Sequence, residues 1–190
     1  MNVLTDVFPT TVEIDGKEYE INTDFRTGID IMLAYEDPTL TAADKAAVLL
    51  HLLYKEIPPD LGKAAELAVL FLDCGEERKP GDGAEPAQRL YSFGKDAKYI
   101  YSAIRQTHGI DLETAGYMHW WKFCYLLLDL NEDCFFQQMI ALRRRKRDGK
   151  LTKEERLAYY RMEDIMELPQ EKDAEQRAAE EAFLQNFRAE

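Results

Sequence analysis

The chain has 190 residues, 46% of them hydrophobic and 11% aromatic, which is typical of a folded protein with a sizeable core and excludes a disordered chain. Its formal net charge of -12 argues against general nucleic-acid binding, because contacts with phosphates need a positive surface. No apolar run reaches the roughly 18 residues of a membrane span, and the N-terminus lacks the basic and apolar regions of a signal peptide. The odd count of three cysteines favours reduced thiols over disulfides. We therefore expect a soluble intracellular protein.

The first regular structure is a predicted β-hairpin over residues 12–21. Apolar and polar residues alternate on both sides of Asp15-Gly16, a pair that favours a type I′ turn. A lone hairpin is marginal in water, so its apolar face should pack on helices. Three helices are predicted to follow, with N-cap residues Asp24, Thr41 and Asp60 and stop signals at Asp37, Ile57 and Gly75.

Residues 75–89 are rich in glycine, proline and charge and lack apolar periodicity, so we expect a flexible linker or loop. A phosphate-binding loop is the alternative, but Gly81-Asp82-Gly83 and its flanks match neither a P-loop nor a dinucleotide fingerprint. This segment separates residues 1–74 from a second helical part, residues 90–168. We expect both parts to form one compact unit.

The second part is predicted to begin with an amphipathic helix that carries Phe93 and ends at Gly109. Asp111 is a natural N-cap for the run into the next helix, and a further helix carries Phe135 and continues into the basic residues 143–147.

A last long helix is expected after Thr152, because Thr152 and Glu155 have the spacing of a capping box, and Pro169 should close it. Residues 169–190 should form a peripheral helix whose only large apolar groups are Phe183, Leu184 and Phe187. The predicted fold class is therefore mainly α, a helical bundle-like domain with an N-terminal β-hairpin.

Residues 117–130 hold both tryptophans and are apolar nearly all round, which is typical of a buried central helix or of one whose second face meets a partner. Trp120 should belong to the core. Trp121 can either pack in the core or face a partner, because tryptophans are frequent at interface hot spots. At helical spacing, one stripe contains Trp120, Phe123, Cys124, Leu127 and Leu130, and the other contains Met118, Trp121, Tyr125 and Leu128.

No arrangement of residues points to catalysis or to a metal. His119 beside Trp120 could be catalytic, but capping or packing at the start of the central helix explains it better, and no nucleophile pattern accompanies it. Asp111 and Glu113 could form an acid/base pair, yet helix capping and first-turn charge account for both. The histidines lack metal-binding spacings. We expect no enzyme activity and no cofactor.

Residues 143–147 read Arg-Arg-Arg-Lys-Arg and form the strongest charge feature. One interpretation is contact with RNA or DNA. The interpretation we favour is a helix C-terminus whose cations complement the helix dipole and pair with the excess of carboxylates. A third is a docking patch for an acidic partner.

The order of segments resembles one known family. The motif residues are Ser92 to Ala103, with an aromatic, an aspartate and an Ile-Tyr pair, then Gly109-Ile110-Asp111-Leu112 and His119-Trp120-Trp121-Lys122-Phe123. With the hairpin, residues 10–145 resemble the tail assembly chaperone-like proteins encoded among the tail genes of bacteriophages and prophages. Residues from Leu151 onward carry no such resemblance.

The resemblance implies a non-enzymatic protein of the host bacterial cytoplasm, absent from or minor in the mature virion, that binds the tape measure protein and keeps it soluble. Other tail assembly proteins are further partners, and a homo-oligomer is open. Alternatives are a nucleic-acid-associated phage regulator that uses residues 143–147 and a minor structural tail component. The residues we expect at a partner surface are Trp121, Tyr125, Arg143, Arg144 and Arg145.

Overall fold

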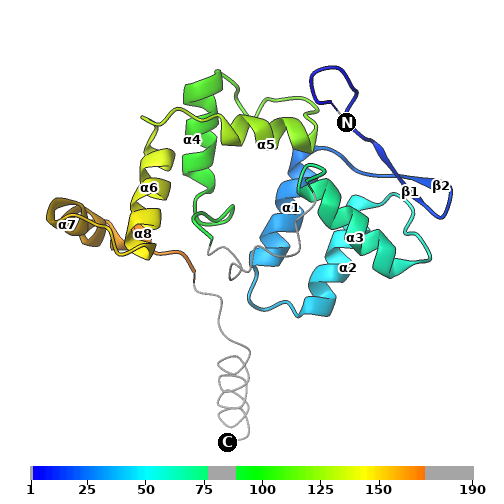
Figure 1. Cartoon of the computed structure of the whole chain (residues 1–190), viewed down its shortest axis with the longest axis horizontal. Coiled ribbons are helices and arrows are strands. Elements are labelled where there is room, and N and C mark those ends of the chain that lie inside the picture. The colour runs from blue at the N-terminus through cyan, green and yellow to red at the C-terminus, as the bar shows by residue number, and fades with distance from the viewer. Residues whose placement is uncertain (1, 77–88, 170–190) are drawn as a thin grey trace, which may run out of the picture.

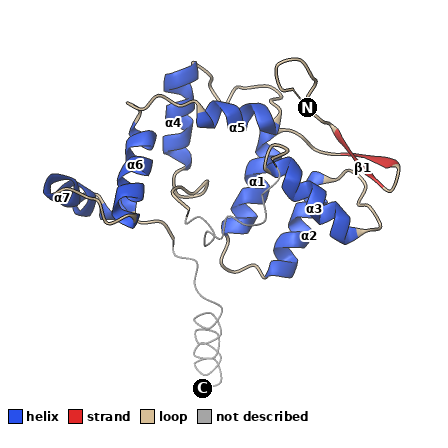
Figure 2. Ribbon diagram, in the orientation of Figure 1, coloured by secondary structure: helices blue, strands red, loops and turns tan. Residues whose placement is uncertain are grey.

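The computed structural model describes residues 2–76 and 89–169. The centre of the predicted linker and nearly all of the predicted C-terminal helix thus lie outside the described residues. Within the described part, eight helices and one two-stranded antiparallel sheet confirm the mainly α fold class with an N-terminal hairpin (Figures 1 and 2). The elements are β1 (Thr11–Ile14), β2 (Lys17–Glu20), α1 (Phe25–Glu36), α2 (Ala42–Leu53), α3 (Leu61–Leu72), α4 (Ala97–His108), α5 (Trp120–Leu128), α6 (Phe135–Arg147), α7 (Lys153–Arg161) and α8 (Glu163–Met166).

The hairpin forms as the turn signal predicts. Asp15 and Gly16 have φ values of 51° and 76°, both in the left-handed region that a type I′ turn requires. Val12 pairs with Tyr19, and Ile14 pairs with Lys17. Ile14 and Tyr19 are buried, so the hairpin rests its apolar face on the helices.

Local signals place most of the helix starts. The side chains of Asp24, Thr41 and Asp60 each accept a hydrogen bond from a backbone N–H in the first turn of α1, α2 or α3. Thr152 and Glu155 form the predicted capping box at the start of α7. The predicted N-caps of these four helices are confirmed.

Three boundaries differ from the prediction, two of them because other parts of the chain bind the backbone there. Helix α2 ends at Leu53, before the predicted stop at Ile57, since Tyr54 forms a β-bridge with Ile21. Helix α4 begins at Ala97 rather than near Phe93, because the carboxylate of Glu36 binds the N–H groups of Phe93 and Gly94 in a turn. The last predicted helix is broken at Met162 into α7 and α8.

The central helix α5 is shorter than the predicted run over residues 117–130. The N–H of Trp120 donates to the carbonyl of Thr23, and the N–H of Phe25 donates to the carbonyl of Met118. These bonds hold the chain extended before α5, in a bridge to the segment that precedes α1. Asp111 therefore does not cap α5; its carboxylate accepts from the N–H of Glu113 and the hydroxyl of Tyr101.

Helix α5 lies between the group formed by α1, α2 and α3 and the helix α4 (Figure 1). The largest cluster of buried side chains draws on the hairpin and on helices α1 to α6. A smaller cluster of Met139, Tyr159 and Met166 joins α6, α7 and α8 at the end of the molecule far from the hairpin.

Gly28 on α1 gives α5 its close approach to α1. A Cβ atom at Gly28 would lie 2.1 Å from Cε3 of Trp120, far inside the contact distance of two non-bonded carbon atoms. The glycine therefore provides the surface on which the indole of Trp120 lies.

We predict that Gly28→Ala lowers the free energy of unfolding by about 3 kcal/mol, because an overpacked core must shift backbone or side chains. Gly62→Ala is the matched control: its Cβ would meet only Asp60 Oδ1 at 3.5 Å, and alanine is the better helix former, so stability should rise by up to about 1 kcal/mol. Denaturant unfolding measures both. Equal stabilities of the two variants would contradict this packing.

Candidate functional site

The two tryptophans of α5 close the end of α3. The indole N–H of Trp120 donates to the carbonyl of Leu72 at 3.0 Å, and that of Trp121 donates to the carbonyl of Phe71 at 2.7 Å. Carbonyls in the last turn of a helix have no partner within the helix, and Trp120 satisfies that of Leu72. The carbonyl of Phe71 also accepts from the N–H of Cys74, so Trp121 gives it a second donor. Trp121 is only 5% exposed. It belongs to the core, and its side chain is not presented to a partner.

The chain reverses at the end of α3 directly under Trp121. Cys74 and Gly75 have φ values of 58° and 78°, which confirms Gly75 as part of the helix stop. A Cβ at Gly75 would lie 3.0 Å from Cη2 of Trp121, so a side chain there would disturb the ring. The thiols of Cys74 and Cys124 hydrogen-bond across the same junction, which lowers the pKa of Cys74 and raises the pKa of Cys124.

His119 is the N-cap of α5, as the capping interpretation predicted. Its Nδ1 accepts a hydrogen bond from the N–H of Trp121 at 3.1 Å, and its Nε2–H donates to the carbonyl of Pro9 at 3.0 Å. Together the two bonds require the neutral ring with its proton on Nε2. Burial lowers the pKa of His119, with a smaller opposing effect from the Pro9 hydrogen bond.

Residues 2–9, here called the N-terminal arm, cover the start of α5. The ring of Phe8 lies 4.9 Å from that of His119, 5.9 Å from that of Trp121 and 6.1 Å from that of Tyr125. The first residues of the arm form a capped turn, in which Asn2 Oδ1 accepts from the N–H of Leu4. The arm thus covers much of the second stripe that the sequence left open between core and partner.

The most exposed large apolar side chains of the described residues lie on the arm and at the end of α5. Leu4 is 90% exposed, Val7 is 89% exposed and Leu128 is 78% exposed. Tyr125 is half-buried, lies one helical turn from Leu128 and contacts Phe8. We refer to Leu4, Val7, Tyr125 and Leu128 as the arm–α5 surface.

Arg143, one of the expected partner-binding residues, is buried. Its Nε donates to the carbonyl of Met166 at 2.7 Å, and its two terminal nitrogens bind both carboxylate oxygens of Asp96 at 2.6 and 3.0 Å. Those nitrogens also donate to the carbonyls of Leu90 and Ile165. All five N–H groups of the guanidinium are therefore used inside the protein.

The remaining basic residues of α6 are at the surface, and most of them pair with carboxylates. Arg145 pairs with Glu155 at 2.8 Å, Arg147 pairs with Asp148 at 2.9 Å, and Lys146 pairs with Glu167. Arg144 is exposed. The interpretation of this run as a helix end that pairs with the protein's own carboxylates is confirmed. The expected partner-binding residues that reach the surface are Tyr125, Arg144 and Arg145.

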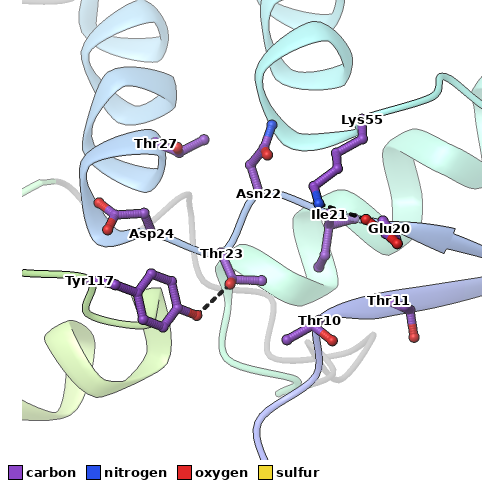
Figure 3. A pocket seen from close by; sticks show the side chains of 10 residues that line it. All are labelled: Thr10, Thr11, Glu20, Ile21, Asn22, Thr23, Asp24, Thr27, Lys55 and Tyr117. Carbon is purple, nitrogen blue, oxygen red and sulfur yellow. Dashed lines mark hydrogen bonds and ion pairs between the residues drawn. The ribbon is translucent and has the colours of Figure 1, made fainter.

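An open polar hollow of about 500 Å³ lies between β1, the segment before α1 and Tyr117 (Figure 3). The hydroxyls of Thr23 and Tyr117 hydrogen-bond at 2.6 Å, and Lys55 pairs with Glu20 at 2.6 Å on the other side. Lys55 and Glu20 thus bind each other, and the third charged side chain of the hollow, Asp24, caps α1 and pairs with Arg26. In residues 2–76 and 89–169, no three His, Cys, Asp or Glu side chains gather to hold a metal ion. Across the same residues, no helix has the length and apolar character needed to cross a membrane.

Residues 4–168 match the family model described as "Bacteriophage Gp15 protein". The chain belongs to this family. The expected bacteriophage origin is thereby confirmed, and the match extends over residues 151–168, which the sequence resemblance did not reach. No curated protein and no solved structure matches the chain.

We predict that Arg143→Met lowers the free energy of unfolding by about 3–5 kcal/mol, because it leaves the carboxylate of Asp96, fully buried, without its partner. Arg144→Met removes an exposed cation from the same helix and should cost no more than about 0.5 kcal/mol. The double variant Arg143→Met/Asp96→Leu should recover much of the loss, since it removes both buried charges. Denaturant unfolding of the four proteins tests the prediction, which fails if Arg143→Met and Arg144→Met are equally stable.

We also predict that the protein loses stability as the pH falls below about 6.5, the pKa that His119 has in the unfolded chain. The folded state holds His119 neutral, so its pKa is lowered, and the unfolded state binds the extra proton. The stabilisation that depends on neutral His119 is therefore fully present above this pH. It is lost as the pH falls towards the lower pKa of the folded state. Thermal unfolding between pH 7.5 and 5 should show a smaller loss for His119→Asn, which can still cap α5, than for the exposed control His51→Asn. Identical losses would rule out this role of His119.

Proposed function

We propose that this bacteriophage Gp15-family protein is a tail assembly chaperone, which binds the tape measure protein and keeps it soluble until the tail is built. The observation that carries the proposal is the arm–α5 surface, on which Leu4, Val7 and Leu128 are between 78% and 90% exposed. The arm and α5 contact each other through Phe8 and Tyr125, and large apolar side chains left exposed on both segments favour a protein partner. Family membership supports the setting, a phage-infected bacterial cell.

The proposed partner fits the chemistry of this surface. The resemblance to tail assembly chaperones implies a tape measure protein that is long, helical and prone to aggregate until tail-tube subunits polymerise around it, and we propose that apolar stripes of its helices bind here. An amphipathic helix could place such a stripe on Tyr125 and Leu128, with Leu4 and Val7 of the arm beside it, in a helix-in-groove contact. The net charge of -12 would keep the complex soluble.

In this proposal the protein acts by binding and not by catalysis, in the host cytoplasm, and leaves the tail before the virion is mature. Other tail assembly proteins and a second copy of the chain are further partners of the same kind. A nucleic-acid regulator is less well supported, because Arg143 is buried and Arg145, Lys146 and Arg147 pair with carboxylates. The finding of stoichiometric amounts of the protein in purified virions would favour a structural tail component instead.

The test is capture of the tape measure protein of the same phage on co-expression. The double variant Leu4→Asp/Leu128→Asp should weaken capture by about tenfold or more, since truncation of an interface hot spot costs at least 1–2 kcal/mol. Leu61→Asp, which changes a 55% exposed leucine at the start of α3, is the matched control and should bind as the wild type does.

Circular dichroism must show that all three proteins are folded. The proposal is refuted if the wild type captures no tape measure protein, or if the double variant captures as much as the control. Salt-sensitive binding of the purified protein to DNA or RNA at nanomolar affinity would instead support the regulator.

A further inference from the structure

Helix α7 carries an exposed face that nothing in the described chain covers. Five exposed residues of α7 recur at the spacing of one helix face: Lys153, Arg156, Leu157, Tyr160 and Arg161. Leu157 is 63% exposed and Tyr160 is 55% exposed. The opposite side of α7 is anchored by the buried Tyr159, which packs with Met139 of α6 and Met166 of α8.

This face has the opposite charge to the rest of the protein. Its five residues include three cations and no carboxylate, in a chain whose net charge is -12. On the α7 face itself, Lys153, Arg156 and Arg161 surround the two apolar side chains, and none of them forms an ion pair with another described residue. The face therefore suits an acidic segment with an apolar stripe.

The end of the chain has that composition. Residues 170–190 contain six carboxylates and three basic side chains. Phe183, Leu184 and Phe187 are their only large apolar side chains, and Glu180 and Glu190 precede and follow them by one helical turn. An apolar stripe between carboxylates is complementary to the α7 face, in which apolar side chains lie between cations.

The chain is long enough for the C-terminal segment to reach the α7 face. The described chain reaches Pro169, eight residues after the last residue of α7. Glu167, just before it, pairs with Lys146, so the chain leaves from the side of α6 that also supports α7. The fourteen residues that follow Pro169, up to Phe183, would span about 20 Å as a helix, whereas α7 with its nine residues is about 14 Å long.

We propose that residues 170–190 fold back on their own chain and dock on α7, with Phe183, Leu184 and Phe187 covering Leu157 and Tyr160. The carboxylates of the segment, Glu180 and Glu181 among them, then face Arg156 and Arg161. The contact is independent of the arm–α5 surface and of the proposed function, because it lies at the other end of the molecule and needs no partner (Figure 1).

Hydrogen exchange of the full-length protein, read by mass spectrometry on peptides from residues 178–190, tests the docking. These amides should be protected in the wild type, and Leu157→Asp should speed their exchange by about tenfold, because exchange follows the fraction of undocked segment. Leu61→Asp on α3 is the control and should leave their exchange unchanged. Peptides from α7 must keep their own protection in Leu157→Asp, so that loss of the helix is excluded as the cause.

A charge exchange provides the second measurement. Two double variants should each speed exchange of the C-terminal amides: Arg156→Glu/Arg161→Glu on α7 and Glu180→Arg/Glu181→Arg in the C-terminal segment. The combination of all four changes should restore protection. Equal exchange in the wild type and Leu157→Asp would overturn the proposal. So would protection that rises with protein concentration, because the segment would then dock on a second copy. Failure of the combined variant to restore protection would also overturn the assigned charge pairing.

Discussion

The packing of α5 on the end of α3 is the constraint on which the rest of the structure depends. The indoles of Trp120 and Trp121 bind two carbonyls in the last turn of α3, and Gly28 lets Trp120 reach α1 as well. A helix end buried in a core must find hydrogen-bond donors, and an indole N–H can supply one without adding charge. The same two residues thus bury large apolar rings and complete the backbone hydrogen bonding of another helix. This is why both stripes of the α5 sequence are apolar at its start.

Two carboxylates with little exposure, those of Glu36 and Asp96, likewise bind backbone groups. These groups belong to residues 92–94, shortly after residues 77–88. Glu36 of α1 accepts hydrogen bonds from the hydroxyl of Ser92 and from the N–H groups of Phe93 and Gly94. Asp96 binds the N–H of Ser92 and both terminal nitrogens of Arg143. Because Arg143 also holds the carbonyls of Ile165 and Met166, one guanidinium joins the return of the chain to α6 and α8. A bidentate, fully hydrogen-bonded pair is the arrangement in which a buried charge is tolerated.

The parts of this fold that sequence reasoning predicted correctly are those determined by neighbouring residues. Asp15-Gly16 specifies its own turn, and Thr41 and Thr152 cap their helices through side chains three positions away. The errors arise where a distant segment decides. The start of α5 was placed too early because its preceding residues pair with Thr23 and Phe25, about 95 positions earlier in the chain. Arg143 was expected at the surface and is buried for the same reason: its partner, Asp96, lies 47 residues away, and no spacing in the sequence links the two.

A contact between distant segments also determines which side chains form the arm–α5 surface. Sequence pattern identified the second stripe of α5, but it could not show that Phe8 of the N-terminal arm already covers Trp121 and part of Tyr125. Covering the first turn of α5 shifts the exposed apolar surface to Leu128 and to the arm itself, where Leu4 and Val7 point away from the core. Because His119 binds Pro9 through one ring nitrogen and caps α5 through the other, the position of the arm and the start of the helix depend on the same side chain. If the arm–α5 surface binds a partner as proposed, that partner contacts two chain segments whose relative position His119 holds.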